Sequence, residues 1–154
     1  MEDSYVPLLY YWGGVYFLIF WCAMLWVVSR FSGWNELAKR YPLENHEADD
    51  VEWHAWDFGR FQLGCGYKGC LWIGFSPEGL FLKTGPDLIF RVAHPPLMIP
   101  WRCITPMGQH RGLWRDLLKL RIEGMDFTIS LSENTMRHAA RWLPEQASAQ
   151  NSAE

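Results

Sequence analysis

Charged side chains are missing from the first part of this chain. The 24 residues from Val6 to Ser29 contain no Asp, Glu, Lys, Arg or His. A helix of this length in a globular protein normally carries a polar face toward solvent, so the pattern argues against a buried core helix. At a rise of ~1.5 Å per residue, the segment is long enough to cross the ~30 Å hydrocarbon layer of a bilayer. We therefore expect a single transmembrane helix at residues 6–29.

Basic side chains are also missing before this segment. Residues 1–5 are acidic, which argues against a cleaved secretory signal, because such signals begin with Lys or Arg. Basic residues follow the other end, beginning at Arg30, and the positive-inside rule then places the N-terminus outside and the rest of the chain in the cytoplasm. The side chains expected at the two membrane interfaces are Tyr10, Tyr11, Trp12, Trp26, Arg30 and Trp34.

The motifs of common enzyme classes are absent from the sequence. It contains no Gly-x-Ser-x-Gly and no phosphate-binding loop. Residues 64–69 have G-x-G-x-x-G spacing but open no helix, as a dinucleotide site requires. His46-Glu47 lacks the second histidine of a zinc protease helix. We therefore expect no catalytic site and no cofactor.

Cysteine is scarce, with four in the chain. In a reducing cytoplasm we expect free thiols that pack as small apolar groups. The alternative is a metal-binding or redox enzyme that uses Cys65, Cys70 and Cys103 with His94 or His110. Zinc sites usually repeat a closely spaced cysteine pair, and no second pair is present, so the sequence favours inward packing.

The part of the chain after the transmembrane helix is long enough for one domain. About 125 of the 154 residues remain, which suffices for a single core. We expect a short extracytoplasmic segment at 1–5, a juxtamembrane helix and acidic linker at 30–55, a β domain at 56–144 and a disordered tail at 145–154. Either the membrane surface or the domain must cover the apolar face of the juxtamembrane helix, because two turns are unstable alone. That face contains Trp34, Leu37, Ala38 and Tyr41.

Short β-prone segments separated by turn residues predict the architecture of the domain. Residues 64–69, 76–79 and 123–124 have the glycine and proline content of hairpin turns. An apolar face over residues 136–143 predicts a C-terminal helix that ends at Pro144. We expect a seven-stranded antiparallel sandwich or barrel capped by this helix. The expected strands are Trp56–Leu63, Cys70–Phe75, Gly79–Lys83, Leu88–Ala93, Leu97–Ile104, Leu113–Ile122 and Met125–Leu131.

Seven antiparallel strands followed by one helix resemble a pleckstrin-homology-like (PH-like) fold, of the kind found in bacterial PH and GRAM-type domains. The stretches Gly33–Tyr41, Pro77–Leu82 and His94–Trp101 further resemble a family of short bacterial membrane-anchored proteins. This resemblance implies an N-terminal transmembrane helix, a PH-like domain and a bacterial inner-membrane setting. It brings no catalytic residues.

Basic side chains are concentrated in one part of the domain, where Asp116 is the only acid among them. Near an anionic membrane surface each would contribute ~1 kcal/mol of binding free energy. The alternative is an ordinary solvated sheet face, because the net charge of the chain is −3. The candidate lipid- or partner-binding residues are Arg102, Arg111, Arg115, Lys119 and Arg121.

These patterns together predict a non-enzymatic interaction module accessory to a bacterial inner-membrane assembly. The expected partners are membrane lipids and a larger membrane complex, bound through the transmembrane helix or through a sheet edge. The negative net charge does not favour nucleic acid as a partner.

Overall fold

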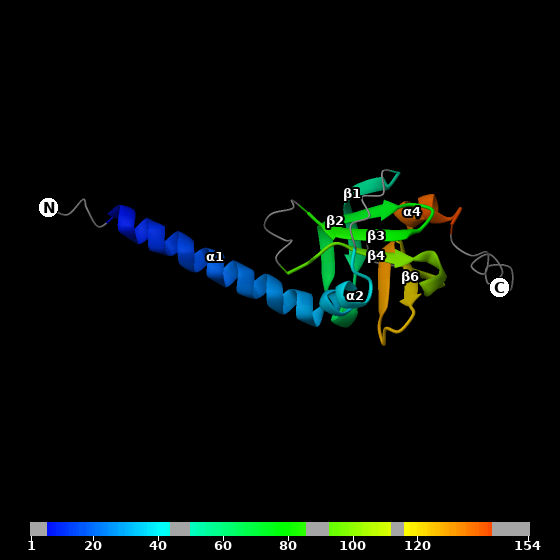
Figure 1. Ribbon diagram of the computed structural model, residues 1–154, viewed down its shortest axis with the longest axis horizontal. Coiled ribbons are helices and arrows are strands. Elements are labelled where there is room, and N and C mark those ends of the chain that lie inside the picture. The colour runs from blue at the N-terminus through cyan, green and yellow to red at the C-terminus, as the bar shows by residue number, and fades with distance from the viewer. Residues whose placement is uncertain (1–5, 44–49, 86–92, 112–115, 143–154) are drawn as a thin grey trace.

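A computed structural model of the chain describes residues 6–43, 50–85, 93–111 and 116–142. The long helix α1 (Val6–Phe31) projects from one side of a curled β-sheet (Figure 1). Its segment Tyr10–Phe31 is long and apolar enough to cross a membrane. The predicted N-terminal apolar helix is therefore confirmed, and it extends two residues beyond Ser29.

A short second helix, α2 (Trp34–Arg40), packs into the domain directly after α1. Gly33 joins the two helices with φ 76°, a left-handed conformation that favours glycine. The side chains of Trp34 and Leu37 are fully buried in the domain core. The sequence left open whether the membrane surface or the domain covers the apolar face of this helix. In the structure the domain covers it. The expected position of Trp34 at the membrane interface is corrected accordingly, since its apolar ring fills the core.

Seven antiparallel strands form one curled sheet, a half-barrel, in the order β4-β3-β2-β1-β7-β6-β5 (Figure 1). The predicted fold class, mainly β with an N-terminal apolar helix and a C-terminal helix, is confirmed. The strands are β1 (Glu52–Arg60), β2 (Gly66–Phe75), β3 (Gly79–Thr84), β4 (Leu97–Pro100), β5 (Ile104–Arg111), β6 (Asp116–Ile122) and β7 (Thr128–Ser132).

Two strand assignments differ from the sequence prediction. Strand β1 begins at Glu52, so the β domain starts inside the segment expected to be the end of the linker. The expected strand Leu97–Ile104 is instead β4 and the start of β5, separated by the 3-10 helix η2 (Trp101–Cys103). Strand β5 continues over residues 105–111, where no strand was expected. Most of the expected strand Leu88–Ala93 lies outside the described residues.

Two of the three expected hairpin turns are confirmed. The Ser76 N–H donates to Gly79 O at 3.2 Å, and the Met125 N–H donates to Ile122 O at 3.1 Å. The third turn is displaced, because the chain reverses at the 3-10 helix η1 (Gln62–Gly64) and residues 66–69 already belong to β2.

The C-terminal helix is shorter than expected. Helix α4 (Glu133–Met136) continues as the 3-10 helix η3 (Arg137–Ala139). The Trp142 N–H donates to Ala139 O at 2.9 Å, which tightens the backbone after η3. The Trp142 ring stacks on Trp101 with centroids 6.0 Å apart, so ring packing accompanies the early end of the helix. The expected end of the helix at Leu143 lies outside the described residues.

The hydrophobic core lies between the strands of the curled sheet and α2. Trp34 contacts the rings of Phe61 and Tyr67, with centroids 5.4 and 5.5 Å away. The fully buried aliphatic side chains around them come from β2, β3, β4, β6 and β7: Leu71, Ile73, Leu80, Leu82, Leu97, Ile99, Leu120, Ile129 and Leu131.

Candidate functional site

The exposed apolar surface of α1 is the first feature of the structure that bears on function. Four of the side chains expected at the membrane interfaces, Tyr10, Tyr11, Trp12 and Trp26, are exposed large apolar groups. Arg30, near the end of the helix, is also exposed.

The last turns of α1 differ from the rest of the helix because the domain covers one side of them. Leu25, Ser29 and Ser32 are buried, and Val28 packs against the core. The helix is therefore free along most of its length and held by the domain at its C-terminal end.

A buried chain of polar side chains connects the end of α1 to the sheet. The Ser32 hydroxyl lies 2.9 Å from the Tyr67 hydroxyl, which lies 2.8 Å from Nε2 of His94. The Trp34 indole N–H donates to Pro95 O at 2.9 Å. Burial raises the pKa of the Tyr67 hydroxyl well above its ordinary value, because the phenolate would lose its hydration. Three separate chain segments are thus fixed to one another beside the end of α1.

The cysteines of the alternative metal site do not gather with His94. Cys65, Cys70 and Cys103 are free, half-buried thiols. In the part of the chain that the structure describes, the one group of three His, Cys, Asp or Glu side chains with donor atoms close together contains no cysteine. Burial raises the pKa of the Cys70 thiol, as expected for an unreactive packed cysteine. The side chain of His110 lies outside the described residues.

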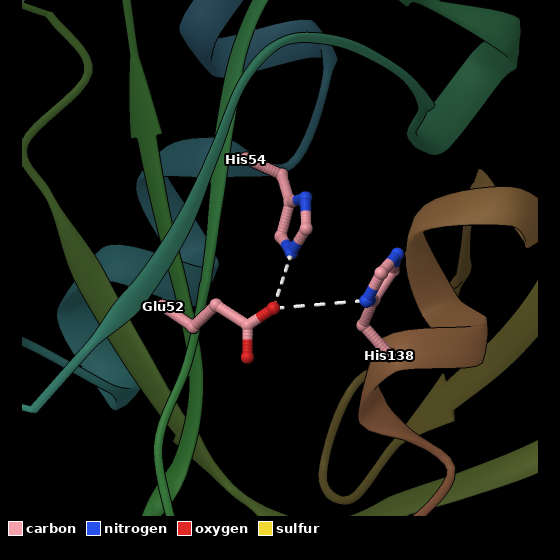
Figure 2. Close-up of side chains that lie close together, drawn as sticks. All are labelled: Glu52, His54 and His138. Carbon is pink, nitrogen blue, oxygen red and sulfur yellow. Dashed lines mark hydrogen bonds and ion pairs between the residues drawn. The ribbon is translucent and has the colours of Figure 1, made fainter.

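That one group consists of Glu52, His54 and His138, and we call it the Glu-His cluster (Figure 2). Glu52 and His54 alternate along β1 and so point to the same face of the strand. His138 reaches the same point from η3 (Figure 2). Oε1 of Glu52 lies 3.3 Å from Nε2 of His54 and 3.6 Å from Nδ1 of His138.

Neighbouring side chains support this cluster. Arg141 donates to the other carboxylate oxygen of Glu52, Oε2, at 2.8 Å. The His54 ring packs beside the buried ring of Phe75, with centroids 5.4 Å apart. The side chains of Glu52, His54 and His138 are 43%, 26% and 54% exposed, so solvent and ions reach the cluster. Two imidazole nitrogens and one carboxylate oxygen form a donor set that suits transition metals.

The sequence prediction missed this cluster. Glu52 and His54 fell in the expected linker, where their two-residue spacing carries no meaning. Only a strand that begins at Glu52 places the two side chains on one face. No local pattern connects them to His138, since the sheet brings these distant segments together.

The basic residues proposed from the sequence are only partly described. Arg102, Lys119 and Arg121 are exposed, whereas the side chains of Arg111 and Arg115 lie outside the described residues. Lys119 and Arg121 share one face of β6, and Leu120 between them is buried on the other face. Arg121 also lines a cavity of about 570 Å³, which includes the acid Asp126.

Comparisons of this chain with family models, with curated proteins and with solved structures find no match. The features of the chain that bear on function are the apolar helix, the surfaces of the sheet and the Glu-His cluster.

Proposed function

We propose that this protein is a single-pass protein of the bacterial inner membrane whose cytoplasmic β domain is a non-enzymatic interaction module. The observation that carries the proposal is the exposed apolar surface of α1, which extends away from the sheet (Figure 1). Burying such a surface in lipid gains ~25 cal/mol per Å², whereas exposed apolar patches of this size are rare in soluble proteins. Arg30, Lys39 and Arg40 near the domain support a cytoplasmic orientation.

A sheet edge is the surface that suits a protein partner. Strands β4 and β5 are the two ends of the sheet. Strand β4 is partly covered by the residues that directly follow α2. The Met98 N–H donates to Tyr41 O at 3.1 Å, and Pro42 forms a β-bridge with Leu97. Strand β5 pairs with β6 on one side only in the described part of the sheet. A partner segment can extend the sheet there by strand addition, as an accessory subunit or scaffold would require.

Contacts between basic side chains of the domain and anionic lipid head groups would add to the membrane affinity of α1. Arg102, Lys119 and Arg121 are exposed basic side chains, and each would contribute ~1 kcal/mol at an anionic membrane surface. Asp126 beside Arg121 in the cavity reduces this attraction. These residues therefore support general attraction to an anionic leaflet.

Membrane extraction of the full chain tests the anchor and its orientation. We expect the protein in the membrane fraction of bacterial cells, resistant to alkaline carbonate and released by detergent, while a variant without residues 1–29 leaves that fraction. A green fluorescent protein fused after Glu154 should fluoresce, and alkaline phosphatase at the same place should be inactive, because both report a cytoplasmic C-terminus. Carbonate-soluble full-length protein, or active phosphatase, contradicts the proposal.

Site-specific cross-linking in the same cells tests the interaction role. A photo-reactive residue at Met107, an exposed position on β5, should give a discrete cross-linked product. The matched control is the exposed position Glu78 in the β2–β3 turn, which should give none. Equal products from both positions would argue against β5 as the docking edge.

A further inference from the structure

Two of the three donor pairs in the Glu-His cluster have the spacing of a zinc site. Zinc lies ~2.0–2.1 Å from histidine nitrogen and ~2.0–2.2 Å from carboxylate oxygen, so neighbouring donors in a tetrahedral site are about 3.3–3.5 Å apart. Oε1 of Glu52 lies 3.3 and 3.6 Å from the nitrogens of His54 and His138, and all three donor atoms lie within 4.8 Å of one another. We propose that Glu52, His54 and His138 bind one zinc ion, with water as the fourth ligand.

The surroundings of the cluster fit a monodentate carboxylate ligand. Arg141 donates to Oε2 of Glu52 at 2.8 Å. The other oxygen, Oε1, faces the two imidazoles (Figure 2). Neighbouring hydrogen bonds that orient a metal ligand are common around zinc and raise metal affinity. The Arg141 side chain is 60% exposed, so water and salt screen its repulsion of a bound cation.

The ligand types select the class of ion. Ca²⁺ and Mg²⁺ prefer oxygen donors, whereas two imidazoles and one carboxylate suit Zn²⁺ and are a known set in zinc proteins. The bound ion would join the start of β1 to η3. Zinc would therefore stabilise the folded domain, because the unfolded chain does not hold these ligands together.

Zinc titration of the intact protein tests this site. Tag-free full chain in detergent, treated with a chelator and then titrated with zinc chloride by calorimetry, should bind one ion per chain and unfold at a higher temperature. His138→Gln and Glu52→Gln should each weaken zinc binding by at least about tenfold. Removing a metal ligand should reduce zinc affinity at least as much as removing a residue that hydrogen-bonds to a ligand. His138 is 54% exposed, so its replacement should leave folding intact, as circular dichroism would verify.

Glu78→Gln is the matched control, since Glu78 is an exposed carboxylate outside the cluster. It should bind zinc as the unaltered protein does. Failure to bind one zinc ion per chain, or binding that both cluster variants leave unchanged, would overturn the proposal.

Cobalt provides a spectroscopic test that distinguishes ligation by His138 from non-specific binding of metal ions to the protein surface. Co²⁺ replaces Zn²⁺ in tetrahedral sites, and His138→Cys offers the ion a thiolate in place of an imidazole. The cobalt-loaded His138→Cys protein should show a sulfur-to-cobalt charge-transfer band that the unaltered protein lacks. If this band is absent while the variant is folded, His138 does not ligate the metal.

Discussion

The Tyr67 hydroxyl connects the end of α1 to the sheet. It lies within hydrogen-bond distance of both Ser32 and His94 inside the domain. The sequence offered His94 as a ligand of the alternative metal site. In the structure His94 is buried and bonded to Tyr67. The residue pattern could not show this, because the partners of His94 come from distant parts of the chain.

Burial of Tyr67 predicts a specific loss of stability in alkali. Its pKa is raised in the folded protein, so its contribution is complete below the unfolded pKa of about 10 and is lost as pH rises from there toward the folded pKa. We expect the free energy of unfolding to fall above about pH 10, and to fall less steeply in Tyr67→Phe, as denaturant unfolding between pH 8 and 12 would measure.

If Tyr67→Phe keeps the alkaline slope of the unaltered protein, the alkaline loss of stability comes from other groups.

At the scale of elements, the connection between α1 and α2 depends on one residue. Gly33 has φ 76°, and a Cβ atom there would lie 2.5 Å from the Phe127 ring. Alanine would therefore meet both an unfavourable backbone conformation and a close contact. We expect Gly33→Ala to cost more than the ~1–2 kcal/mol of the left-handed backbone alone, as measured by denaturant unfolding of the full chain in detergent.

Gly64→Ala is a matched control for this effect. Gly64 has φ 75°, but a Cβ atom there would meet no atom within 4 Å, so alanine adds backbone strain without a contact. The difference between the two variants isolates the contact with Phe127. Equal destabilisation would mean that the Phe127 ring moves aside freely.

The elements also show which sequence signals are reliable. The apolar run of α1 and the turn residues at 76–79 and 123–124 act locally, and the structure confirms them. The start of β1 was placed too late because its first five residues mix polar and apolar side chains and none of them is fully buried. The same error concealed the Glu-His cluster, since Glu52 and His54 share a face only within a strand.

At the scale of the whole molecule, α2 belongs to the β domain. Trp34 and Leu37 fill its core, and replacing side chains of this kind by alanine costs ~3–5 and ~2–5 kcal/mol. Their combined loss is comparable with the total stability of a small domain, ~5–15 kcal/mol. We expect residues 30–154 to unfold cooperatively on heating and residues 43–154 to show no cooperative transition, as circular dichroism would measure.

If residues 43–154 unfold cooperatively at the same temperature as residues 30–154, the domain does not depend on α2 for its stability. The sequence could predict the apolar face of the helix, because that face follows from local periodicity. It could not predict which surface covers the face, since lipid and a protein core are both apolar.

The burial of Leu25, Ser29 and Ser32 against the domain has a mechanical consequence. A flexible linker would leave the domain free to rotate about α1, whereas here the domain packs directly on the last turns of that helix. The orientation of α1 therefore fixes the orientation of both edge strands, β4 and β5. A partner that binds the helix would for this reason meet the domain from a restricted set of directions.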